Sequence, residues 1–296
     1  MDLRHLRYFV HVAEELHFGR AARRLGVSQP PLSQQIQALE QELGVRLFDR
    51  SNRRVALTEV GRLFLPEARA TLAQAARAGD IARRAHRGEV GELSIGITAS
   101  APFAGTIPRA IFSYRQAHPH VRLTIVEMSS DRQISALLSG ELDVGFIRSP
   151  ERPAVPADIT ATELFEDRLI VALRDDHPLA TSNRPLRICD LAGQPFIFYA
   201  RDLGIGLHEQ VIALCRDAGF EPLVAQEARE VSTLLGLIAA GLGITVMSES
   251  LRALHVDHVV YASLDDPRAV TKMWLIQNRL RTFPVRQSFL DVLLSV

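Results

Sequence analysis

Gln34, Gln37 and Gln41 recur at spacings of three and four residues, with Pro30 and Ser33 on or beside the same stripe. In a helix these spacings place the side chains on one face. A glutamine amide offers both a hydrogen-bond donor and an acceptor, which are the groups needed to recognise a base edge in the major groove of DNA. The chemistry that this face predicts is base recognition.

The opposite face of the same helix is apolar. Its members follow at spacings of four, three and four: Leu32, Ile36, Leu39 and Leu43. Ser28 is expected to cap the helix, and the two prolines that follow are tolerated because first-turn N–H groups have no helical partner. Gly26 permits a reversal from a helical pattern that begins at Phe18. Residues 18–43 therefore predict a helix-turn-helix, although an ordinary helix pair in a larger bundle has the same pattern.

A polar turn follows the helix pair. Leu47 and Phe48 precede DRSNRR, and VALT follows it, which predicts two short strands around a wing tip. Arginines at this tip would contact phosphates or a narrow minor groove, and a solvated loop is the alternative. The candidate DNA-contacting residues are Ser28, Gln29, Pro30, Pro31, Ser33, Gln34, Gln37, Arg50, Arg53 and Arg54.

The whole N-terminal segment resembles the LysR-type family of bacterial transcriptional regulators. The resemblance rests on LRYFVHVAEE, AARRL, SQPPLSQQIQALEQELG and the wing LFDR…R…LTEVG. It implies a winged helix-turn-helix that binds double-stranded DNA. One departure is Gln34, which stands where the family often has arginine, and this leaves the preferred half-site open.

Charge is unevenly distributed along the 296 residues, which are enough for two or three domains. Residues 1–90 carry 15 arginines and 10 acidic residues, net +5, whereas the remainder carries 19 basic and 24 acidic residues, net −5. A basic front on an acidic body suits nucleic acid at one end. We expect a DNA-binding domain at 1–58, a dimerisation linker helix at 59–88 and an effector-binding domain at 89–296.

The linker is expected to be one long helix from a cap at Thr58 to about Arg87. A seam of mostly small residues would allow a partner helix to approach closely: Ala68, Leu72, Ala75, Gly79 and Ala82. Pro66 lies well inside the helix and is expected to kink it. The polar segment 86–92 is expected to form the hinge to the next domain.

From Leu93 onward strand patterns alternate with helical ones, which predicts βαβ units and a mostly parallel sheet. A second set of this kind begins near 169, and the strand at 272–277 and the helix at 283–296 are expected to return to the first lobe. The fold class is therefore α/β, and the two lobes resemble the type-2 periplasmic-binding-protein fold. We expect lobe I at 89–164 and 269–296, and lobe II at 165–268.

Serines and threonines that end a strand and open a helix offer hydroxyl and N–H groups to an anion. Helix capping is the simpler role for each of them, but their recurrence at the carboxyl ends of strands favours a pocket. Arg148 would add charge, unless it forms a surface ion pair, and Tyr199 would add an aromatic wall. The candidate effector-binding residues are Thr98, Ser100, Ala101, Ser129, Arg148, Tyr199, Arg201, Ser232 and Thr233.

Other functions find little support in the residues. No G-x-S-x-G elbow, P-loop or H-E-x-x-H motif is present, so we expect neither an enzyme nor a cofactor. His255 and His258 lack a third ligand for a metal. Cys189 and Cys215 are expected to be buried and inert, with a redox switch as the alternative. The sequence has no membrane-spanning or signal-like apolar stretch, so a cytoplasmic protein is expected.

Together these features predict a regulator whose promoter binding is modulated by a small-molecule effector. The family resemblance implies a dimer of dimers, autoregulation, both activation and repression, and RNA polymerase as a further partner. The wording QPPLSQQIQ with LRHLRYFV resembles the branch that controls aromatic-acid catabolism, which implies a small aromatic or unsaturated carboxylate. An effector-independent repressor or architectural DNA-binding protein, and an enzyme built on the two-lobed fold, are the alternatives.

Overall fold

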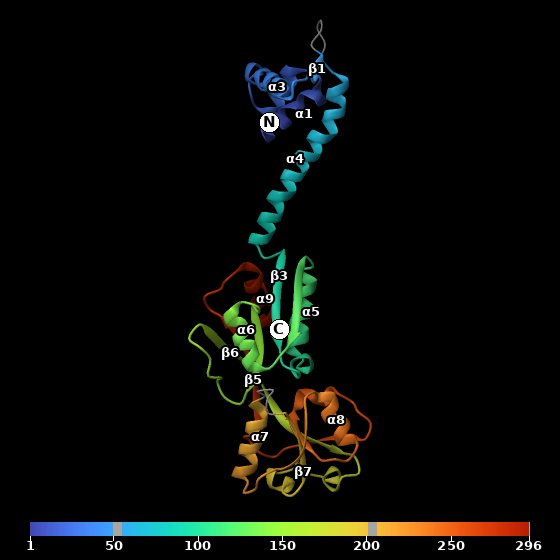
Figure 1. Cartoon of the computed structure of the whole chain (residues 1–296), viewed down its shortest axis with the longest axis vertical. Helices are drawn as coiled ribbons and strands as arrows, with labels where there is room; N and C mark the ends of the chain where they lie inside the picture. The colour runs from blue at the N-terminus through green and yellow to red at the C-terminus, as the bar shows by residue number, and fades with distance from the viewer. Residues whose placement is uncertain (50–54, 201–205, 296) are drawn as a thin grey trace. The chain divides into compact units, whose positions relative to one another are not determined.

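The computed structural model describes residues 1–49, 55–200 and 206–295. The chain divides into two compact units, Met1–Arg84 and Ala85–Val296, whose elements are labelled in Figure 1. The N-terminal unit is mainly helical, and the C-terminal unit combines helices with a mixed sheet.

Three short helices, a two-stranded hairpin and a long helix make up the N-terminal unit. They are α1 (Leu3–Glu15), α2 (Phe18–Leu25), α3 (Gln29–Leu43), β1 (Phe48–Asp49), β2 (Ala56–Leu57) and α4 (Glu59–His86), which continues two residues into the second unit. Gly26 and Gly44 end α2 and α3 in the left-handed conformation, each with φ +69°, which glycine adopts without a side-chain clash. The helix-turn-helix and the strand pair are therefore confirmed.

The core of this unit is built on the apolar face of α3. Leu32, Ile36 and Leu39 are fully buried, and Leu43 packs at the edge of the same cluster. Aromatic rings add to it, because the ring centroid of Phe9 lies 5.4 Å from that of Phe48. Such close, tilted ring pairs favour one fixed arrangement of the helices.

Helix α4 is continuous through Pro66, and the kink expected there stays a prediction. It departs from the expectation at its seam of mostly small residues. Ala68 and Leu72, which the sequence assigns to a dimerisation seam, instead pack into the core of their own N-terminal unit. The Thr58 hydroxyl accepts the N–H of Gly61 at 2.9 Å, which confirms the predicted cap.

The C-terminal unit alternates strands and helices. Its first part contains β3 (Gly91–Ile97), the 3-10 turn η1 (Ala101–Phe103), α5 (Thr106–Ala117), β4 (Val121–Glu127), α6 (Ser130–Ser139) and β5 (Val144–Ser149). Its middle part contains β6 (Ile159–Arg174), η2 (Pro178–Thr181), η3 (Ile188–Leu191), β7 (Pro195–Tyr199), α7 (Gly206–Asp217), β8 (Leu223–Ala228), α8 (Val231–Ala239) and β9 (Thr245–Ser248). The last part contains η5 (Glu249–Ala253), β10 (Val259–Ser263), β11 (Val270–Asn278) and α9 (Pro284–Ser295).

The main sheet is mixed, so the prediction of a mostly parallel sheet is wrong. Its strand order is β10-β6-β11-β5-β3-β4, with β9 also paired to β6. Strands β4, β3 and β5 are parallel, whereas β11 runs antiparallel to β5 and β6. The separate pair β7–β8 is parallel.

Strand β6 explains the error. It begins at Ile159, ten residues before the apolar run 169–173 that marks it in the sequence. Its first half pairs with β11 on one side only, so it keeps exposed polar residues such as Glu163. Its second half pairs with β9 and β10 and is buried. One strand therefore runs through both cores of this unit.

The two halves of this strand lie in separate hydrophobic cores. One contains Ile95 and Phe146 with Phe289 from α9, which contacts α5 and β3. Others contain the second half of β6 together with β7, α7 and α8. The fold class, an N-terminal winged helix-turn-helix with a two-core α/β unit, matches the expectation from the sequence.

Candidate functional sites

The outer face of α3 presents amides to solvent. Gln34 and Gln37 are exposed and Ser33 is half-buried, whereas Leu32 and Ile36 on the opposite face have no exposed area. The residues that lead into the helix are exposed as well: Ser28, Gln29, Pro30 and Pro31. Because the apolar face is held by the core, the amide face is fixed in orientation and free to meet a ligand.

Ser28 does not cap α3 through its side chain, contrary to the expectation. It occupies the N-cap position with an extended backbone, but its hydroxyl makes no capping hydrogen bond. A capping hydroxyl accepts the N–H of the second or third helical residue, and here those residues are Pro30 and Pro31, which have none. The Ser28 hydroxyl is therefore not used by the helix.

Glu40 fastens α3 to the hairpin, a role that the sequence analysis missed. Its Oε1 accepts the backbone N–H groups of Leu47 at 2.8 Å and Phe48 at 3.0 Å. The hairpin pairs Phe48 with Leu57, so this carboxylate ties the end of the helix to the base of the wing. Wing-tip Arg50, Arg53 and Arg54 lie outside the described residues.

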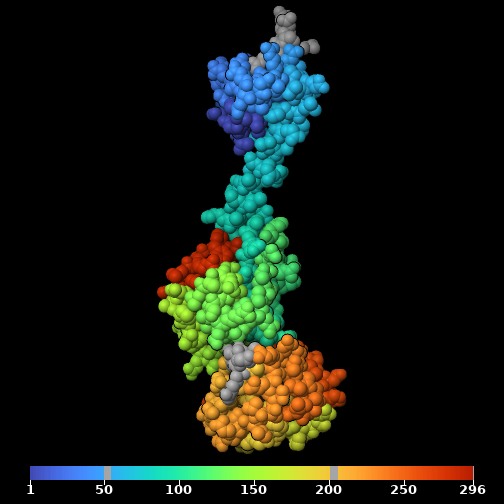
Figure 2. All heavy atoms as spheres, in the orientation of Figure 1, coloured from blue at the N-terminus to red at the C-terminus, as the bar shows by residue number. Residues whose placement is uncertain are grey.

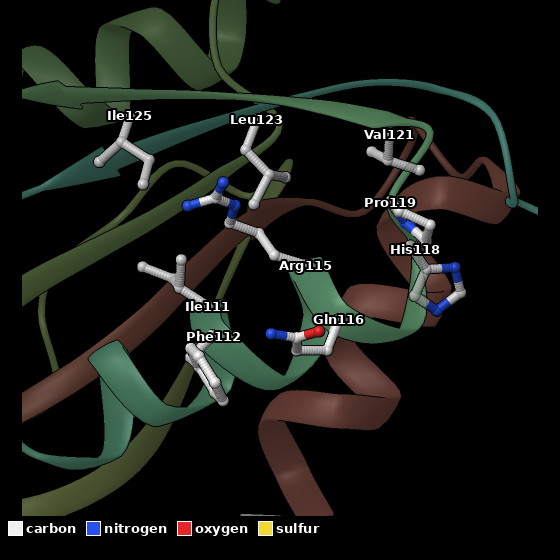
Figure 3. Close-up of a pocket in the computed structure, with 9 residues that line it drawn as sticks. All are labelled: Ile111, Phe112, Arg115, Gln116, His118, Pro119, Val121, Leu123 and Ile125. Atoms are coloured by element: carbon white, nitrogen blue, oxygen red, sulfur yellow. The ribbon is translucent and has the colours of Figure 1, made fainter.

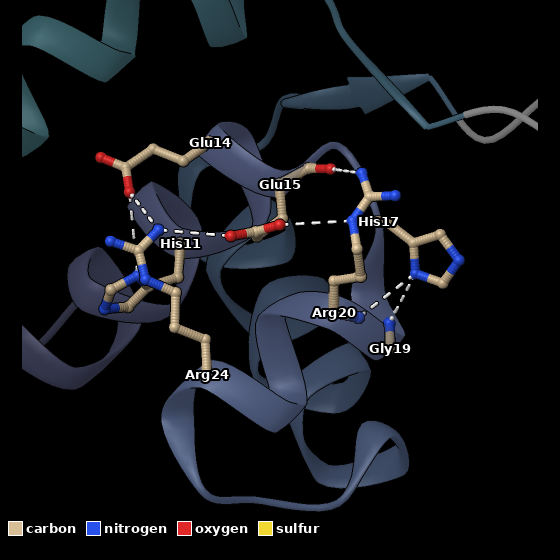
Figure 4. A network of polar contacts seen from close by, with 7 residues as sticks. All are labelled: His11, Glu14, Glu15, His17, Gly19, Arg20 and Arg24. Carbon is tan, nitrogen blue, oxygen red and sulfur yellow. Dashed lines mark hydrogen bonds and ion pairs between the residues drawn. The ribbon is translucent and has the colours of Figure 1, made fainter.

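Ion pairs join α1 to α2 and α4 (Figure 4 shows all of these residues but Arg69). Glu14 contacts Arg24 at 3.0 Å and Arg69 at 2.9 Å, and Glu15 contacts Arg20 at 3.3 Å. The hydrogen bond from Arg69 lowers the pKa of the Glu14 carboxyl. These exposed pairs fix helix orientation more than they add stability.

Three candidate effector-binding residues lie at the carboxyl ends of adjacent parallel strands. Thr98 follows β3, Ser129 follows β4 and Arg148 lies near the end of β5. The strands are in register there, because Ile97 pairs with Glu127 on one side and with Phe146 on the other. Ligands of α/β sheets bind at this edge.

Arg148 is the centre of a buried polar cluster. Its Nε donates to the Ser100 hydroxyl at 2.6 Å and its Nη2 donates to the Asp167 carboxylate at 2.7 Å. Asp167 also accepts hydrogen bonds from the backbone N–H and the hydroxyl of Ser250. Ser250 lies in η5, two residues after the end of β9. The side chains of Arg148 and Asp167 are only 10% and 9% exposed, so the alternative of a surface ion pair is wrong.

Three buried polar atoms at strand ends have no hydrogen-bond partner among the described residues. They are Nη1 of Arg148 in β5, Oγ1 of Thr98 after β3 and the hydroxyl of Ser248, the last residue of β9. Burial lowers the pKa of the Arg148 guanidinium, while Asp167 opposes that shift. Buried donors without a partner are costly, so a water or a ligand is expected to bind them. Asp167 already balances the positive charge of Arg148. Hydrogen bonds from these groups would therefore contribute to binding an anion as much as charge attraction would.

The remaining candidates lie in different surroundings. Ala101 is fully buried in η1, and Tyr199 is a core residue of β7 whose pKa is raised by burial. Ser232 and Thr233 are exposed in the first turn of α8, whose N-cap position is Glu230 instead of a serine or threonine. No described contact joins them to Arg148. Arg201 lies outside the described residues.

Asp167 and Ser250 were not among the residues expected from the sequence. Asp167 lies in the polar half of β6, which shows no strand pattern, so nothing in the sequence points to it. Ser250 had a usable signal, because it follows a strand pattern in the same way as Ser100 and Ser129 do.

A separate hollow of about 550 Å³ lies between α5 and β4 (Figure 3). Phe112, Leu123 and Ile125 line it together with Arg115 and Gln116. Phe112 is 66% exposed and Ile125 43%, although both are apolar. The hollow is therefore an exposed apolar surface, and none of the candidate effector-binding residues lines it.

The two cysteines differ. Cys215 is buried, as expected, and burial raises the pKa of its thiol to about 11. Cys189 is exposed, so the expectation that it is buried is wrong. Within residues 1–49, 55–200 and 206–295, no group of three or more His, Cys, Asp or Glu could hold a metal ion. In the same ranges, none of the helices has the length and apolar character needed to cross a membrane.

Family models match the two units. Residues 3–62 match the bacterial regulatory helix-turn-helix protein model of the lysR family, and residues 86–296 match the LysR substrate binding domain.

Individual proteins match over nearly the whole chain. The chain is 42% identical over 276 residues to YnfL of Escherichia coli (strain K12), an uncharacterised HTH-type transcriptional regulator, covering 93% of this chain and 92% of the relative. It is 38% identical to the HTH-type transcriptional regulator BenM of Acinetobacter baylyi, covering 93% and 89%. Full-length CbnR, crystallised in complex with its target DNA, superposes with a TM-score of 0.86 at 29% identity, covering 100% and 99%. The chain belongs to the LysR family of DNA-binding transcriptional regulators, with an N-terminal helix-turn-helix and a C-terminal effector-binding domain.

Proposed function

We propose that α3 recognises promoter bases through Gln34 and Gln37, with Ser33 and the exposed residues at the start of the helix. The observation that carries this is the division of α3 into a fully buried apolar face and an exposed amide face. Arginines of the wing would add phosphate contacts that are independent of sequence. As a DNA-binding protein of a bacterial family, it would act in the cytoplasm, as a regulator and not as an enzyme.

Base recognition is tested with duplexes selected by the protein from a random library. Gln37→Ala should reduce the preference for the selected duplex over random duplex by roughly tenfold, because one good base contact is worth about 1–3 kcal/mol. Glu67→Ala, on the exposed side of α4, is the matched control and should leave the preference unchanged. Equal preferences in Gln37→Ala and wild type would remove this residue from the base contacts.

For the effector-binding domain we propose a small aromatic or unsaturated carboxylate. Nη1 of Arg148 and the hydroxyls of Thr98 and Ser248 provide unmatched buried donors that suit a carboxylate. We also propose domain boundaries at 58, 88 and 164–165. The remaining candidate effector-binding residues stay part of the proposed site. An effector-independent repressor or architectural protein is the second candidate, and ligand binding distinguishes it.

The effector proposal is tested with benzoate and its uncharged analogue benzamide. Benzoate should raise the unfolding temperature and change promoter binding, whereas benzamide should do so much less, because it lacks the carboxylate. Ser100→Val should weaken the benzoate response while promoter binding is retained. Equal responses to both compounds would contradict a carboxylate site, and no response to any small acid would favour the effector-independent regulator.

Self-association is proposed to use the α5–β4 surface. This surface is apolar and includes Arg115, and β8 exposes Leu223 near Glu221 and Glu227. The two surfaces are complementary in charge, so the proposed occupant is β8 of a second copy in a dimer of dimers. Phe112→Asp should lower the molar mass of the assembly measured by light scattering.

RNA polymerase is the further partner expected at the promoter.

A further inference from the structure

A histidine begins the first helix of the helix-turn-helix. His17 is the N-cap of α2, and its Nδ1 accepts the backbone N–H of Gly19 at 3.1 Å and of Arg20 at 3.3 Å (Figure 4). Serine, threonine, aspartate and asparagine are the usual N-caps. An imidazole differs from them because the nitrogen that accepts these hydrogen bonds becomes a donor when it carries a proton.

The same imidazole lies beside a residue of the proposed base-reading face. A Cβ placed on Gly19 would lie 3.1 Å from Cε1 of His17 and 3.3 Å from Oε1 of Gln29. The His17 ring and the Gln29 amide therefore lie against the same glycine. The first turn of α2, fixed by His17, forms the surface on which the Gln29 side chain rests at the start of α3.

Proton binding would break this arrangement. A ring nitrogen that accepts two N–H groups must be unprotonated, and in an imidazolium both ring nitrogens are donors. The added charge would also face the positive end of the α2 dipole. The cap would therefore be lost when His17 takes up a proton, and the first turn of α2 would loosen beneath Gln29.

Other charged groups form ion pairs along α2, from its first turn to its last. Glu14, Glu15 and His11 come from α1, Arg20 and Arg24 from α2, and Arg69 from α4. The carboxylates are already paired with arginines. His11 is the second titratable imidazole, 3.9 Å from Glu14, and so an experiment on pH must separate it from His17.

We propose that His17 is a positioning residue for base recognition, which makes the preference of this regulator for its operator fall when the imidazole is protonated. The inference rests on the proposed base recognition by α3. The loss concerns the preference for the operator and not DNA binding in general. The added positive charge would strengthen attraction to any duplex, while the placement of Gln29 is lost.

The test is the ratio of affinities for the selected duplex and for random duplex, measured at pH 8 and pH 5.5. In wild type the ratio should fall by roughly tenfold at pH 5.5, the size expected for losing one good base contact. His17→Ser should keep the ratio high at both values, because a hydroxyl caps the helix and does not titrate. His17→Ala should have a low ratio at both values, and His11→Gln should behave as wild type.

Each outcome is informative. A wild-type ratio that does not change with pH, or the same fall in His17→Ser as in wild type, would overturn the inference. Loss of the pH dependence in His11→Gln would assign it to the other histidine. A ratio of one for wild type already at pH 8 would instead contradict the proposed base recognition, which the His17 variants do not test.

Discussion

Arg148 is paired with a carboxylate nineteen residues away in the chain, and both side chains are about nine-tenths buried. The arginine and Ser100 were predictable from their positions at strand ends, whereas Asp167 was not, because its half of β6 lacks a strand pattern. A buried pair of this kind costs desolvation energy, so its value lies in fixing geometry more than in stability. The unmatched Nη1 and the hydroxyls of Thr98 and Ser248 make this pair the best-supported part of the proposed effector site.

Removing one partner of this pair should be much worse than removing both. Asp167→Asn leaves the Arg148 cation buried without a counter-charge and should lower the free energy of unfolding by roughly 3 kcal/mol. The double variant Arg148→Met with Asp167→Leu should recover most of that loss. Urea unfolding of the full chain measures both. Similar stabilities for Asp167→Asn and wild type would show that the pair is open to water.

The two thiols should differ in reactivity. At pH 8 a thiol whose pKa is raised to about 11 remains protonated, so Cys215 should not react with Ellman's reagent, and its burial adds to this protection. Exposed Cys189 should react, giving one modified thiol per native chain and two after unfolding. Cys189→Ser should abolish the native reaction. Two rapidly modified thiols in the native wild type would contradict the placement of Cys215.

Elements with a strong period were predictable, and those shaped by their neighbours were not. The buried face of α3 follows directly from its leucine and isoleucine spacing. The missing Ser28 cap could have been foreseen, because Pro30 and Pro31 have no N–H to offer. The mixed sheet could not, since the first half of β6 is held by β11 from more than 100 residues later in the chain. Ala68 and Leu72 show that a seam of mostly small residues does not indicate whether it packs within its own chain or against a second copy.

Glu40 links two elements, and its removal should loosen the wing. In Glu40→Ala the N–H groups of Leu47 and Phe48 lose their acceptor, which should destabilise the N-terminal unit by about 1–3 kcal/mol. Gln41→Ala, an exposed neighbour on the same helix, is the control and should cost little. Hydrogen exchange at residues 47 and 48 reports the effect locally. Unchanged protection of these amides would show that Glu40 does not hold the hairpin.

On the scale of the whole molecule, charge and function are divided between the two units. The first 90 residues carry net +5 and contain the helix-turn-helix, and the remainder carries net −5 and contains the effector-binding domain. Net charge alone would give binding to any duplex, with an affinity that falls steeply as salt rises. Regulation requires more, because an effector can act only through a state that differs in its affinity for the operator.

The most direct measurement compares affinity for the selected duplex and for random duplex from 50 to 300 mM salt. If α3 recognises bases, affinity for both duplexes should fall with salt while the preference for the selected duplex remains at least about a hundredfold throughout, as for specific regulators. If the preference shrinks toward one as salt rises, binding is electrostatic only, and base recognition by the amide face of α3 is contradicted.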